Sequence, residues 1–119
     1  MKVAILGASR LPDRFAYQAF KLLQQYGHTP VPVTPKFADI EGVKALATLG
    51  EVKEPIDTLT MYVGPELSTK LSADILSLKP RRVIFNPGSE NPELARKLEA
   101  AGVDVVEHCT LVMLRAGEF

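Results

Sequence analysis

Short apolar runs recur along the chain, and between them lie segments in which apolar residues fall three or four positions apart. Most of these runs are rich in β-branched residues, which is typical of strands buried on both faces of a parallel sheet. The pattern therefore predicts five strands, at residues 3–6, 31–33, 58–63, 83–85 and 103–106.

Three of the intervening segments have the spacing of amphipathic helices. Their apolar stripes are Ala16, Phe20, Leu23 and Tyr26; Leu67, Leu71, Ile75 and Leu78; and Leu94, Leu98 and Ala101. We expect Asp13 to cap the first helix, Gly27 to end it, and Asn91 to cap the third. A weaker pattern predicts a helical stretch over residues 42–49, and the tail at 110–114 fits either a short helix or a sixth strand.

Strands that alternate with helices through short connections form right-handed βαβ units. The predicted fold class is therefore α/β, with a Rossmann-like, doubly wound, five-stranded parallel sheet and helices on both of its faces. This is a three-layer α/β/α arrangement. The length of 119 residues fits one domain, spanning residues 1–119.

Composition narrows the classes of partner. The 14 basic residues balance 14 acidic ones, so the net charge of zero argues against a nucleic-acid or membrane-surface binder. A single cysteine excludes an internal disulfide framework and fits a reducing compartment. No apolar run has the length of a signal-peptide core or a membrane span. We therefore expect a cytoplasmic protein with a small-molecule ligand.

The loop after the first strand has the features of a phosphate site. Its candidate binding residues are Gly7, Ala8, Ser9, Arg10 and Arg14. The glycine permits a tight turn, and the small residues after it let a phosphate approach the backbone near the positive end of the next helix. The two arginines can add charge-assisted hydrogen bonds. A plain turn with two solvated arginines is the alternative.

The loop after the second strand bears on which nucleotide is bound. An NAD site normally has an acidic residue there, but this chain has Thr34, Pro35 and Lys36. A lysine suits an additional phosphate group. The loop therefore counts against NAD, leaves NADP open, and fits coenzyme A, whose ribose carries a 3′-phosphate.

Two further loops supply uncharged candidates. In the third loop, Tyr62, Val63 and Pro65 offer an apolar wall for an adenine ring. In the fourth, Asn86 and Gly88 offer groups that can hydrogen-bond a pantetheine arm, although a glycine there also simply permits a turn.

Candidate catalytic groups are few, and we assign none. His108 and Cys109 are neighbours at the end of the fifth strand, but neighbouring side chains in a strand point to opposite faces. A buried structural role is the simpler interpretation of the cysteine. One thiol and two histidines without clustered partners also give no metal site.

The order of these features resembles the small stand-alone CoA-binding proteins related to the N-terminal domain of the succinyl-CoA synthetase α subunit. The matching residues are Gly7-Ala8-Ser9, Pro12, Arg14, Tyr17, Val33-Thr34-Pro35-Lys36, Ile40, Gly42, Pro55-Ile56-Asp57, Pro65-Glu66, Gly88, Asn91, Glu93, Ala101-Gly102 and Cys109. The resemblance implies a Rossmann-like CoA-binding fold without assigned catalysis. It implies that the pyrophosphate lies at residues 7–10, the 3′-phosphate near Lys36, and adenine against Val63 and Pro65.

The sequence thus favours a non-catalytic protein that binds coenzyme A or an acyl-CoA. One alternative is an NADP-linked reductase, suggested by Lys36. Another is a regulatory or interaction domain with a vestigial pocket, because many relatives have an arginine where Val63 stands and a glutamine where Asn86 stands. A chain of this size can also form a homodimer or a complex with a partner enzyme.

Overall fold

Five parallel strands form the main sheet, as the sequence pattern predicted. The computed structural model describes residues 1–119, and the strand order across the sheet is β2-β1-β5-β6-β7. These strands are β1 (Lys2–Leu6), β2 (Thr29–Val33), β5 (Thr58–Met61), β6 (Arg82–Phe85) and β7 (Asp104–Glu107). The order reverses between β1 and β5, and ligands of doubly wound sheets bind at such a reversal, beyond the carboxyl ends of the strands.

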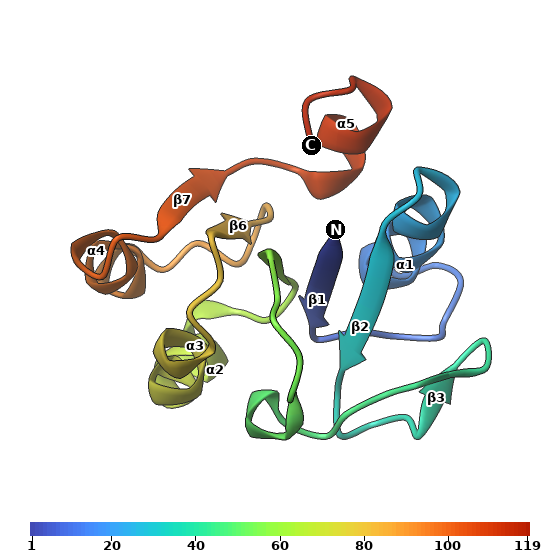
Figure 1. The fold of residues 1–119 in the computed structure, drawn as a ribbon, viewed down its shortest axis with the longest axis horizontal. Helices are drawn as coiled ribbons and strands as arrows, with labels where there is room; N and C mark the ends of the chain where they lie inside the picture. The colour runs from blue at the N-terminus through green and yellow to red at the C-terminus, as the bar shows by residue number, and fades with distance from the viewer.

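Helices cover both faces of the sheet, which confirms the Rossmann-like α/β class. They are α1 (Phe15–Gln25), α2 (Pro65–Lys70), α3 (Ser72–Leu78), α4 (Pro92–Ala100) and α5 (Thr110–Arg115). Figure 1 shows α1 and α5 on one side and the other three on the opposite side.

The sheet divides the core into two apolar clusters. Strand side chains alternate between the faces, so Val3 and Ile5 of β1 pack with Phe20 of α1, while Ala4 and Leu6 pack with Ile75 of α3. The helices are therefore held by burial of their apolar stripes against the sheet.

Residues 42–49 do not form the expected helix. Strands β3 (Asp39–Ile40) and β4 (Val43–Lys44) form a small antiparallel pair, and a short 3₁₀ helix, η1, spans Leu49–Glu51. The segment stays extended because its backbone pairs with the end of β2. Leu46 donates its N–H to the Pro32 carbonyl and accepts the Thr34 N–H, at 3.0 and 2.8 Å.

Two helix boundaries also differ from the sequence pattern. Asp13 does not cap α1, because a turn brings the Arg14 N–H 3.0 Å from the Leu11 carbonyl and the helix begins only at Phe15. The Asp13 carboxylate therefore accepts no hydrogen bond from the first turn of α1.

The second apolar stripe forms two helices, α2 and α3, which meet at Leu71. Asn91 caps α4 as expected, and its side chain accepts the Leu94 N–H. The tail forms the helix α5 rather than a sixth strand.

Candidate functional site

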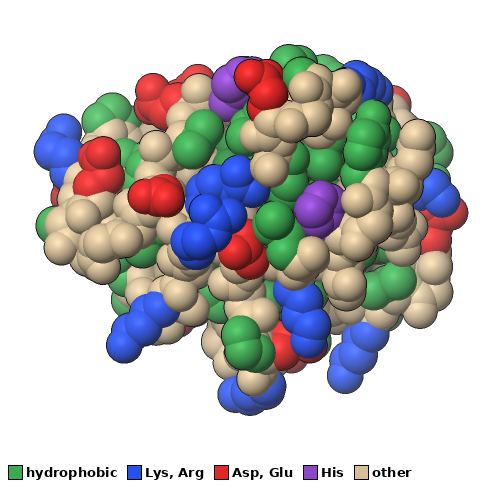
Figure 2. Space-filling view, turned by 45° about the horizontal axis from the view of Figure 1, so that its top comes forward, with side chains coloured by type: hydrophobic (Ala, Val, Ile, Leu, Met, Phe, Trp, Pro, Cys, Tyr) green, Lys and Arg blue, Asp and Glu red, His purple; other side chains and the backbone are tan.

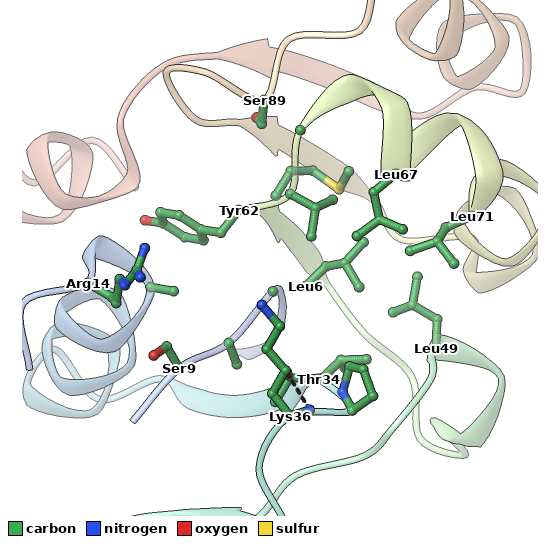
Figure 3. A pocket seen from close by; sticks show the side chains of 18 of the residues that line it. Leu6, Ser9, Arg14, Thr34, Lys36, Leu49, Tyr62, Leu67, Leu71 and Ser89 are labelled. Atoms are coloured by element: carbon green, nitrogen blue, oxygen red, sulfur yellow. Dashed lines mark hydrogen bonds between the residues drawn. The ribbon is translucent and has the colours of Figure 1, made fainter. Parts of the chain in front are cut away.

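A cavity of about 760 Å³ opens at the carboxyl ends of β1, β2 and β5, where the strand order reverses. This volume lies within the usual range of small-molecule sites. The loop after β1 and the first turn of α1 form one wall, and α2 with the segment before η1 forms the other (Figure 3).

Gly7 allows the backbone to pass close to the third loop. Its φ is +88°, and a Cβ at this position would lie 2.8 Å from the Tyr62 carbonyl oxygen. The N–H groups of Gly7 and Ala8 both point at the Val33 carbonyl of β2, at 3.0 and 3.3 Å. These two amides therefore hold strands together and are already occupied, although both residues line the cavity.

The unoccupied donors lie one step further along the loop. The N–H groups of Ser9 and Arg10 have no acceptor within the chain, and neither have the first two N–H groups of α1. The Ser9 hydroxyl accepts the Leu11 N–H at 3.1 Å, which fixes the loop. Free amides beside the positive end of an eleven-residue helix favour an anion.

Two unpaired cations accompany these amides. Arg14 and Lys36 line the cavity, and neither lies within ion-pair distance of a carboxylate. Figure 3 shows the Lys36 side chain reaching toward the middle of the cavity. The Thr34 hydroxyl accepts the Lys36 N–H at 3.1 Å, so the loop that carries the lysine is held in place.

Arg10 is placed differently from the other predicted cations. Its guanidinium lies 3.9 Å from the Asp39 carboxylate and 5.0 Å from the centre of the Phe37 ring. The side chain is thus drawn toward β3 and does not line the cavity, whereas Phe37 does.

The opposite wall is apolar. Leu6, Leu49, Leu67 and Leu71 point toward one another in Figure 3, and Val63 also lines the cavity. The sequence placed Leu67 and Leu71 on an apolar stripe but assigned neither to the site, and Leu49 fell at the end of the helix that does not form. No local signal marks Leu49, because its place depends on the pairing of residues 42–49 with β2.

Tyr62 lines the same cavity, but its hydroxyl is directed into the protein. Burial raises the pKa of Tyr62 to about 12, and its hydroxyl has no hydrogen-bond partner. The nearby hydroxyls of Thr60 and Thr110 bond each other at 2.8 Å. The ring, rather than the hydroxyl, is the part of Tyr62 that a ligand meets.

The remaining predicted residues are divided. Pro35 and Gly88 line the cavity, whereas Pro65 lies outside its lining as the first residue of α2. Asn86 is 2% exposed and also lies outside it. Its amide nitrogen donates to the Thr60 hydroxyl and the Met61 carbonyl, at 2.7 and 2.8 Å, and its oxygen accepts the N–H at the start of α5. Asn86 therefore joins β5, β6 and α5.

The two neighbouring residues considered as catalytic candidates, His108 and Cys109, lie outside the cavity. His108 uses its Nδ1 to accept the Cys109 N–H at 2.7 Å, and neither residue lines the cavity. No three His, Cys, Asp or Glu side chains are close enough together to hold a metal ion. No helix is long and apolar enough to cross a bilayer.

The edge formed by the amino ends of the strands differs in charge from the cavity. On the face in Figure 2, basic side chains stand beside acidic ones. Arg81 donates two hydrogen bonds to Asp57, at 2.9 and 3.0 Å, which lowers the pKa of Asp57 to about 2. Arg82 donates to Thr58 and lies 4.4 Å from the Phe119 ring centre. Arg81 at this edge is therefore paired with a carboxylate, whereas Arg14 and Lys36 line the cavity without an ion-pair partner.

Comparisons with known proteins agree with the Rossmann-like fold described above. A family model described as "CoA binding domain" matches residues 1–115. A crystal structure of an uncharacterized protein has a TM-score of 0.94 at 44% sequence identity, and the match covers 99% of this chain and 97% of that one.

Two curated relatives extend the comparison. The protein YneT of Bacillus subtilis is 28% identical over 105 residues, which is 88% of this chain and 78% of YneT. The ADP-forming acetate–CoA ligase II subunit alpha of Pyrococcus furiosus is 33% identical over 69 residues, which is 57% of this chain. The matched part is only 15% of that subunit.

Proposed function

Because this chain belongs to the CoA binding domain family, we propose that it binds coenzyme A or an acyl-CoA in the cavity at the carboxyl ends of β1, β2 and β5. The observation that carries the proposal is the coincidence, in one cavity, of the free amides of Ser9, Phe15 and Ala16, two unpaired cations and an apolar wall. A nucleotide with several phosphates and an adenine ring has matching chemistry.

Each part of the ligand has a partner in this proposal. The pyrophosphate lies on the N–H groups of Ser9 and Arg10, with Arg14 beside it. The ribose 3′-phosphate lies at Lys36, and the adenine packs on Val63 and the leucines of the apolar wall. The sequence placed the pyrophosphate on all four residues 7–10, but the amides of Gly7 and Ala8 are used by β2.

The role that we propose is binding rather than catalysis, since His28, His108 and Cys109 all lie outside the cavity lining. The part of the ligand that reacts in known CoA chemistry is its thiol or thioester. No cysteine or histidine of this chain lines the cavity to act on it.

Calorimetric titration with coenzyme A and with dephospho-coenzyme A tests the proposal. Dephospho-coenzyme A lacks the 3′-phosphate, so its affinity should be about tenfold weaker if Lys36 holds that group. Lys36→Ala should remove most of this difference by weakening coenzyme A alone. Lys44→Ala is the matched control, because Lys44 is an exposed lysine outside the cavity.

The same titration separates the alternatives. Absence of binding at millimolar coenzyme A would refute the proposal and favour a vestigial pocket. Tighter binding of NADPH than of coenzyme A would favour the reductase. Equal affinity for coenzyme A and dephospho-coenzyme A in the unmodified protein would show that the 3′-phosphate is placed wrongly.

A further inference from the structure

Exposed apolar side chains gather at the mouth of the cavity. Large apolar side chains that remain exposed are Met1, Leu11, Phe15, Tyr26, Leu67 and Val112. Leu11, Phe15 and Leu67 all line this one cavity, and Phe15 is the most exposed of the set at 68%. Large apolar side chains left open to water at the rim of a pocket mark a surface for a ligand or partner.

Leu11 and Phe15 lie on the α1 wall, across from the leucines that receive the adenine in the proposed function. Leu11 follows the loop amides, and Phe15 begins α1. If the adenine lies on Val63 and the pyrophosphate at Ser9, the pantetheine arm extends from the pyrophosphate in the direction away from the adenine. The next surface on that wall carries Leu11 and Phe15.

The chemistry of this rim matches an apolar group on an anionic carrier. Arg10 and Arg14 are interleaved with Leu11 and Phe15 along one short segment. The pantetheine arm interrupts its short aliphatic segments with two amides, so it covers only part of an apolar rim. An aliphatic chain attached to the thiol provides one.

Resting on the proposed function, we infer that the ligand of this site is a CoA thioester of an aliphatic acyl chain, which packs against Leu11 and Phe15. Burial of one methylene corresponds to about a fourfold gain in affinity. An acyl chain that packs against one wall and stays open to water on its other side is only partly buried, so each methylene gives less than this fourfold gain in affinity.

Titration with acetyl-CoA, octanoyl-CoA and free coenzyme A tests this inference. We expect octanoyl-CoA to bind at least about tenfold more tightly than acetyl-CoA. In the double variant Leu11→Ser with Phe15→Ser, the ratio of the two affinities should fall to near one. Val112→Ser is the matched control, because Val112 is 49% exposed on α5 and lies outside the cavity; it should leave the ratio unchanged. Circular dichroism checks that both variants keep the fold.

The outcomes separate this inference from the function on which it rests. If coenzyme A and its thioesters all fail to bind, both fail. If coenzyme A binds and octanoyl-CoA binds no more tightly than acetyl-CoA, the acyl assignment is overturned and the binding function stands. A concentration-dependent dimer that Phe15→Ser dissociates, with no dependence on chain length, would show instead that a second copy covers the rim. Binding of this rim to anionic lipid vesicles without chain-length dependence would also overturn it.

Discussion

Replacing Gly7 by alanine perturbs the closest backbone approach beneath the cavity. The new Cβ would lie 2.8 Å from the Tyr62 carbonyl oxygen and 2.9 Å from the Val63 Cγ1. Gly7 also has a φ of +88°, which a residue with a side chain adopts at a cost of about 1–2 kcal/mol. Moving the backbone of the loop after β5 adds about 1–3 kcal/mol.

Gly27→Ala separates these two effects. Gly27 has a φ of +85°, but nothing lies within 4 Å of a Cβ built there. Its substitution therefore carries only the conformational cost, about 1–2 kcal/mol. We expect Gly7→Ala to lower the free energy of unfolding by about 3–4 kcal/mol, roughly 2 kcal/mol more than the control.

Urea denaturation of the ligand-free proteins, followed by circular dichroism, measures both values. The difference between the two midpoints at a common slope is the cost of the close approach. If Gly7→Ala is no more destabilising than Gly27→Ala, the loop carrying Tyr62 and Val63 yields freely and the reasoning is refuted. Coenzyme A titration of the same pair should show weaker binding only for Gly7→Ala, since only that residue borders the proposed site.

Two further predictions concern polar groups outside the proposed ligand contacts. Asn86→Ala removes three buried hydrogen bonds and should lower the free energy of unfolding by about 3 kcal/mol in a urea titration. Ser89→Ala, which loses one bond to a carbonyl, should cost about 1 kcal/mol, and equal costs would contradict the proposed joining role of Asn86. For pH, the pKa of Asp57 in the folded protein is about 2, below its value of 3.8 in the unfolded chain. Its ion pair with Arg81 therefore stabilises the fold fully above pH 4, and this stability is lost as the pH falls from about 4 to 2. Because the Arg81 side chain is 53% exposed, we expect a loss of about 1 kcal/mol. Asp57→Asn should flatten this part of the stability profile, and an unchanged profile would exclude the pair as its cause.

Local patterns determined the sheet, the helices and the edge at which a ligand should bind. Alternating strands and helical stripes require a parallel sheet, since each element must bury its apolar face. The loops after β1 and β2 were predicted from residue types alone, because a glycine turn before a helix and a lysine after a strand act through short-range chemistry. The resemblance to CoA-binding proteins is confirmed by the family match over residues 1–115.

Contacts between distant segments decided the rest. The Val33 carbonyl occupies the amides of Gly7 and Ala8, so the free donors are those of Ser9 and Arg10. The side chain of Asn86 accepts the first N–H of α5, a group that lies 24 residues further along the chain. No spacing in the sequence encodes either event, since each depends on which backbone groups from separate strands and helices come within bonding distance.

The walls of the cavity show the same division. The sequence identified Lys36, whose role depends on its charge and its place after a strand. It missed Leu49, which lines the cavity because residues 42–49 pair with β2 instead of forming a helix. Charge and turn chemistry belong to single residues and can be recognised along the chain, whereas a shared surface exists only after the chain has packed.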